Sequence, residues 1–175
     1  TTPIKYLISF VLPRFCDQSL ERSRKADLYP AGSAGWIAKL DTIVHELYHI
    51  DPEAPGIRRM ERADGTYSAN CHGHRFFENV VEMVNQYLAT KPDPETYDFL
   101  SYDLSELTDR FGGVVGTTFK SFPSYPQRYT HVLEPQPEST PEMNCRVEPV
   151  KVSQVQTRFT EDDLVMREFR GGTSR

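Results

Sequence analysis

Two histidines four residues apart impose the strongest constraint on the fold of this chain. His45 and His49 lie in residues 34–50, where hydrophobic side chains recur with the spacing of an α-helix. Residues four apart share one face of a helix, so both imidazoles can reach a single ion. Prolines and a glycine in residues 51–56 predict the end of this helix. The residues expected on its opposite, apolar side are Trp36, Leu40, Ile43, Leu47 and Ile50.

Glu46 directly follows the first histidine and completes the pattern His-Glu-x-x-His. In this pattern the two histidines bind zinc, and the glutamate takes a proton from the water that the metal activates. The pattern also occurs by chance on solvated helices. Its place on an amphipathic helix that ends directly afterwards favours a zinc-dependent peptidase with Glu46 as general base. One turn earlier, Asp41 is either an exposed charge or a residue that orients a ligand.

A catalytic zinc ion takes three protein ligands and leaves one position open, so a third ligand is needed. In one extended form of the pattern, glycine and histidine would occupy positions 52 and 55, and both are proline here. The ligand must therefore come from further along the chain. His72 follows His49 by 23 residues, and His74 lies beside it. Helical periodicity does not decide between these two, and Cys71 and Glu78 are weaker alternatives.

The combination of His-Glu-x-x-His with a later His72-Gly73-x-x-Phe76 resembles the SprT-like zinc metallopeptidases and related phage-type enzymes. The resemblance covers residues 34–90. It implies a zincin-like core that holds one Zn²⁺, with His72 as third ligand, Phe76 as an aromatic core residue, and a protein or peptide substrate. The cysteines of the zinc ribbon found in many SprT-like proteins are absent here. The proline-rich segment after Gly113 has no counterpart in the pattern.

Further periodic segments predict an α+β fold with two or three main helices and a small sheet. A second helix is expected over residues 75–88 and a third over 93–111, where Gly112 and Gly113 end it. Residues 51–71 lack periodicity and are expected to form a loop. The basic pair Arg58-Arg59 within them is expected on a solvated face.

The last third of the chain has a different character. A strand is expected over residues 114–119, and another within 147–159. Residues 121–149 carry six prolines and are expected to be largely irregular, and 164–169 to form a short terminal helix. The expected organisation is thus a zincin-like core over 1–113 and a C-terminal extension over 114–175 packed on the same domain.

Composition limits the partners and the compartment. A net charge of −5 argues against a nucleic-acid surface, which weakens the alternative of a protease acting on DNA-bound proteins. No apolar run approaches the ~18–20 residues of a membrane span, so no membrane partner is expected. Three cysteines without a Cys-x-x-Cys pair predict a reducing compartment and hence the cytoplasm. A non-catalytic metal-binding or interaction domain is the other alternative.

Overall fold

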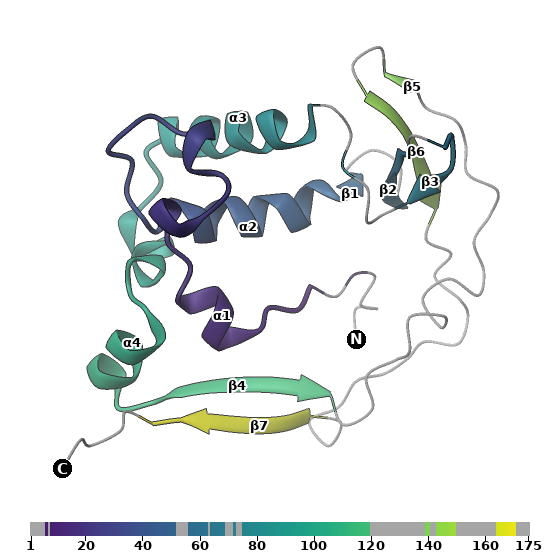
Figure 1. Cartoon of the computed structure of the whole chain (residues 1–175). Coiled ribbons are helices and arrows are strands. Elements are labelled where there is room, and N and C mark those ends of the chain that lie inside the picture. The colour runs from purple at the N-terminus through teal and green to yellow at the C-terminus, as the bar shows by residue number, and fades with distance from the viewer. Residues whose placement is uncertain are drawn as a thin grey trace. The chain divides into compact units, whose positions relative to one another are not determined.

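The computed structural model describes residues 6, 8–51, 56–62, 64–68, 72, 75–119, 139–140, 143–149 and 164–170. These residues form an α+β fold of helices and small antiparallel sheets (Figure 1). They divide into two compact units. The first takes its described residues from Thr1–Leu7, Asp41–Tyr87 and Pro123–Thr157, and the second from Ile8–Leu40, Leu88–Phe122 and Arg158–Arg175. The division cuts across the boundary expected after residue 113, because both sides of that boundary contribute to both units.

The first unit combines two long helices with a sheet whose strands are far apart in sequence. Helix α2 spans Ile37–Tyr48, and its residues from Asp41 onward belong to this unit; helix α3 spans Phe76–Ala89. The sheet has the order β1-β2-β6-β5, and β3 also pairs with β2. All of these pairings are antiparallel, and Met60 lies opposite Cys145 in the ladder. The strands are β1 (Ile50–Asp51), β2 (Gly56–Glu61), β3 (Tyr67–Ser68), β5 (Ser139–Thr140) and β6 (Met143–Pro149).

The core of this unit joins the sheet to α3. Met60, Phe76 and Val80 are fully buried, and Val44, Tyr48 and Met83 pack against them. Burying each large apolar side chain contributes about 1.5–3 kcal/mol. The three core residues come from β2 and α3, and Val44 and Tyr48 from α2, so burial fixes these elements against one another within the unit.

The second unit is built from shorter elements. It contains α1 (Leu12–Cys16), α4 (Leu104–Phe111) and an antiparallel pair of strands, β4 (Val114–Phe119) and β7 (Leu164–Phe169). Asp103 caps α4 by accepting a hydrogen bond from the backbone nitrogen of Glu106, whose carboxylate accepts one in return from the backbone nitrogen of Asp103. Gly112 ends α4 in the left-handed conformation at φ 75°, which glycine adopts without strain.

Several expectations from the sequence are confirmed and others are wrong. Helices α2 and α3 and strand β4 occupy the predicted segments. The third helix is shorter than expected, because 3₁₀ turns at Pro94–Thr96 and Asp98–Ser101 precede α4. The segment expected as a loop contains β2 and β3. Strand β6 begins in the region expected to be irregular and reaches residues 147–149 of the segment in which a strand is expected.

The terminal helix expected over residues 164–169 is wrong, because this segment is strand β7. It pairs along its whole length with β4, from Leu164 opposite Phe119 to Phe169 opposite Val114. Backbone pairing with a distant strand therefore determines its conformation. The pattern typical of a helix start, Thr160 followed by three acidic residues, lies outside the described residues. In the part of the chain that the structure describes, no helix is long and apolar enough to cross a bilayer.

Candidate metal centre

Helix α2 carries His45 and His49 one turn apart, as the spacing predicted. Both side chains are half-buried, and both rings contact Phe76, the first residue of α3. Leu47, expected in the apolar face, is instead 50% exposed. The expected division of this helix into an apolar back and a polar front is therefore wrong at Leu47. Val44 and Tyr48, beside the histidines, supply the contacts with the core.

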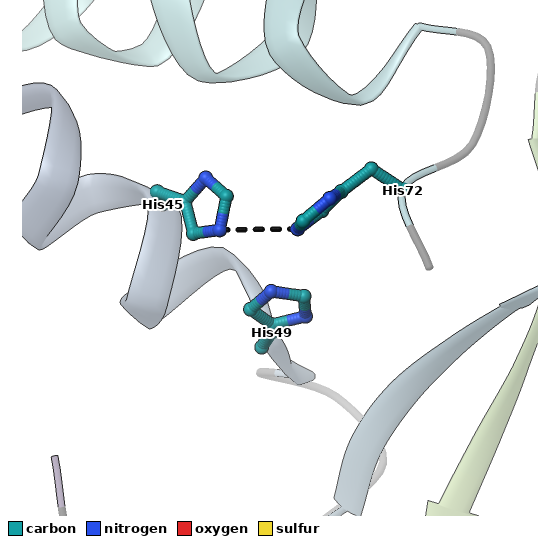
Figure 2. Close-up of side chains that lie close together, drawn as sticks. All are labelled: His45, His49 and His72. Atoms are coloured by element: carbon teal, nitrogen blue, oxygen red, sulfur yellow. Dashed lines mark hydrogen bonds between the residues drawn. The ribbon is translucent and has the colours of Figure 1, made fainter. Parts of the chain in front are cut away.

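His72 completes a cluster of three imidazoles and lies shortly before the start of α3. Its Nε2 atom is 3.1 Å from Nε2 of His45, and a hydrogen bond joins the two rings, one donating and the other accepting according to its tautomer (Figure 2). One nitrogen of each histidine lies within 4.8 Å of the others. Three histidines from two segments thus lie close enough together to bind a single metal ion.

The donor set fits a metal ion. Two nitrogens that bind one zinc ion at ~2.0–2.1 Å in tetrahedral geometry lie about 3.3 Å apart. The Nε2 atoms of His45 and His72 are already at nearly this separation. Imidazole nitrogen suits zinc, copper, iron and nickel, so the donors by themselves do not select one of these metals.

The ring of Phe76 packs against all three imidazoles of the cluster. Its ring centroid lies 4.9 Å from that of His45, 5.0 Å from His49 and 4.5 Å from His72, and the residue is fully buried. An aromatic ring in contact with all three imidazoles restricts their rotation and keeps water from one side of them. Phe76 therefore holds the ligands in place as well as filling the core.

Burial holds His49 in the neutral form. Its pKa is lowered from 6.5 to about 4, first by burial and then by the positive charges of His72 and Arg58 nearby. A neutral imidazole keeps the lone pair that a metal requires. The Nδ1 atom of His49 is also buried, and among the described residues it has no hydrogen-bond partner.

Arg58 lies beside the C-terminal end of α2. Its Nε atom pairs with a carboxylate oxygen of Asp51 at 3.1 Å, and its guanidinium lies over the ring of Tyr48 at 4.5 Å. The side chain is only 17% exposed, so the expectation of a solvated face is wrong for Arg58. No local sequence pattern indicates that Arg58 contacts the end of α2, because it follows Tyr48, the last residue of that helix, by ten residues.

The other polar residues near the cluster differ in burial and in their contacts. Glu46 is half-buried on α2, and Asp41 is almost completely buried one turn before His45. Glu78 is exposed on α3. The hydroxyl of Tyr48 accepts a hydrogen bond from the side-chain amide of Asn79 at 3.0 Å. His74 and Cys71 lie outside the described residues, so the choice of His72 over His74 stays a prediction that the proximity of His72 supports.

Comparisons of the chain with protein-family models, curated proteins and solved structures found no match. The function of the site must therefore be argued from its own residues and distances.

Proposed function

We propose that this protein is a zinc-dependent peptidase in which His45, His49 and His72 hold one Zn²⁺ and Glu46 is the general base. The position of His72 carries the proposal. It approaches within 3.1 Å of His45 although 27 residues separate the two in sequence. A chance pattern on one helix accounts for two neighbouring imidazoles, but not for a third that a distant segment brings to the same point.

The choice of zinc and of a catalytic site rests on the ligand pattern. Three protein ligands with one position left for water are typical of catalytic zinc, whereas structural zinc sites are closed by four. The adjacent Glu46 provides a carboxylate of the kind that peptidases of this pattern use. The proposal includes the zincin-like core and the kinship with SprT-like enzymes, which the burial of Phe76 beneath the histidines supports.

In the proposed peptide hydrolysis, the zinc ion and the side chains of the protein have separate roles. When bound, the zinc ion lowers the pKa of its water and polarises the scissile carbonyl. Glu46 takes the proton from the attacking water and passes it to the leaving amine, which makes it base and then acid in one cycle. Phe76 keeps the ligand rings oriented throughout. The half-buried, neutral His49 remains available as a ligand well below pH 7.

The proposal is tested with purified protein, by metal analysis and by cleavage of a mixed peptide library followed by mass spectrometry. We expect one zinc ion per chain and cleavage that a chelator abolishes. Glu46→Gln should retain the zinc and lose about 10²–10⁴-fold in kcat, the contribution typical of a general base. His72→Ala should lose the zinc.

Glu82→Gln is the matched control, because Glu82 is an exposed glutamate on α3 whose carboxylate accepts a hydrogen bond from the side-chain amide of Gln86. It should keep both the zinc and the activity. Bound zinc without cleavage of any peptide would contradict the peptidase and leave a non-catalytic metal-binding domain. Zinc retained by His72→Ala would contradict the ligand assignment.

A further inference from the structure

Phe77 combines contact with the proposed ligands and exposure to solvent. It follows the buried Phe76 as the second residue of α3. Its ring centroid lies 5.0 Å from that of His72 and 6.0 Å from that of His45. The residue is nevertheless 38% exposed, whereas Phe76 is fully buried. Part of an aromatic surface therefore remains open to solvent directly beside two of the three histidines.

Exposure alone does not set Phe77 apart. Phe99 and Phe111, both in the second unit, are 49% and 65% exposed. Single exposed apolar side chains are normal on protein surfaces. What distinguishes Phe77 is that its ring touches the imidazoles that would hold the metal. A metal held by these imidazoles would therefore lie close to the ring of Phe77.

The dimensions of an extended peptide substrate allow one of its side chains to reach the ring of Phe77. A residue of an extended chain spans about 3.3–3.6 Å, so the side chains that flank a carbonyl at the metal lie within one residue of it. The ring of Phe77 is in contact with two of the ligand rings, at 5.0 Å and 6.0 Å between centroids, so a side chain that flanks such a carbonyl can reach it. Contact between this ring and an apolar side chain removes both from water, and an aromatic partner adds a favourable ring contact.

We propose that Phe77 forms the apolar wall of the subsite that receives the side chain next to the scissile bond. The substrates of this protein are then peptides with a bulky apolar or aromatic residue at that position. This inference rests on the proposed zinc peptidase. In the competing explanation, Phe77 only shields the imidazole of His72 from solvent and has no part in selecting the substrate.

The test measures binding to the zinc-loaded protein rather than turnover. The probes are N-acetylated hydroxamates of phenylalanine and of alanine, which bind zinc through the same group and differ in a single side chain. We expect calorimetry to show that the wild type binds the phenylalanine compound about tenfold more tightly. Phe77→Ala should reduce this preference to less than about twofold, and Phe77→Leu should restore part of it. Phe99→Ala, the matched control, should retain the wild-type preference.

Zinc affinity and thermal unfolding are measured for every variant. These measurements distinguish loss of the zinc site from loss of the preference for the phenylalanine hydroxamate. An undiminished preference in Phe77→Ala would overturn the proposal, as would equal binding of both hydroxamates by the wild type. A reduced affinity for zinc with an unchanged preference would assign Phe77 to shielding. If the wild type binds no zinc, the proposed function fails and this inference with it. If it binds zinc and cleaves peptides without regard to apolar residues, only this inference fails.

Discussion

The Nη1 atom of Arg58 donates a hydrogen bond to the carbonyl oxygen of Tyr48, the last residue of helix α2, across 3.3 Å. The backbone nitrogen of Arg58 donates to the next carbonyl, that of His49, at 2.8 Å. One residue of β2 thus holds the backbone on both sides of the proposed ligand His49. A cation at this point also interacts favourably with the partial negative charge at the end of a helix.

We expect Arg58→Lys to weaken zinc binding about tenfold, within the range for residues that orient metal ligands. Lysine keeps the charge, but its single ammonium group cannot reproduce the planar fork of arginine. It cannot at once pair with Asp51, bond the carbonyl of Tyr48 and lie over the tyrosine ring. The measurement is a competition titration with a chelating zinc indicator, together with the electronic spectrum of the cobalt-substituted protein.

Arg59→Lys is the control, because side chains of successive strand residues point to opposite faces. It should leave the zinc affinity and the cobalt spectrum unchanged. An Arg58→Lys protein that unfolds at a lower temperature but binds zinc as tightly as the wild type would show that Arg58 stabilises the fold without positioning His49.

The parts of the fold that sequence predicted correctly are those that local patterns determine. Phe76, Val80 and Val84 recur every four residues, and all three are buried on α3. His45 and His49 share a helix face because of their spacing alone. In these segments the residues that determine the conformation lie within a few turns of the same helix. Hydrophobic periodicity is therefore sufficient to predict the helix.

The features that were missed depend on residues far apart in the chain. Strand β2 pairs with β6, which places Met60 opposite Cys145, and no pattern near residue 60 reports that partner. The helix prediction for β7 is wrong because its partner β4 also lies far away in sequence. For the same reason the sequence predicted neither the hydrogen bonds from Arg58 to the end of α2 nor the contact of Phe77 with His72. Each arises only when two separate segments meet.

The lowered pKa of His49 predicts how the metal-free protein responds to acid. Its ordinary pKa is 6.5 and its folded value about 4, because burial and neighbouring positive charges oppose protonation. Between these values the unfolded chain binds more protons than the folded one, so stability rises with pH across this window. Acidification from pH 6.5 to 4 should therefore progressively lower the free energy of unfolding. Urea titrations at several pH values in the presence of a chelator measure this change.

His49→Gln supplies the comparison, because glutamine does not titrate in this range. The variant should show a smaller loss of stability between pH 6.5 and pH 4 than the wild type. Identical pH profiles for the two proteins would contradict the burial of an uncharged His49. Added zinc should oppose the acid effect in the wild type and not in the variant, since binding to the folded state alone stabilises it.

Gly116 permits a close approach within the second unit, and its replacement predicts a loss of stability. A Cβ atom at this position on β4 would lie 2.7 Å from Cδ1 of Leu12 and 3.2 Å from Cε2 of Phe169. Overpacking of this kind destabilises by about 1–3 kcal/mol. The smaller backbone entropy that alanine loses on folding offsets about 0.5–1 kcal/mol of this. Gly116→Ala should thus lower the free energy of unfolding by about 1 kcal/mol, as measured by urea denaturation followed by circular dichroism.

A second variant identifies the contact responsible. Leu12→Ala removes the side chain that the new methyl group meets first, so Gly116→Ala should have a much smaller effect in the Leu12→Ala background. The difference between the two backgrounds is the coupling energy of this pair. Fluorescence of Trp36, the one tryptophan of the chain, reports on the same unit because its ring stacks on Tyr97 at 5.2 Å. An equal loss of stability in both backgrounds would show that the packing of α1 against β4 does not determine the need for glycine at this position.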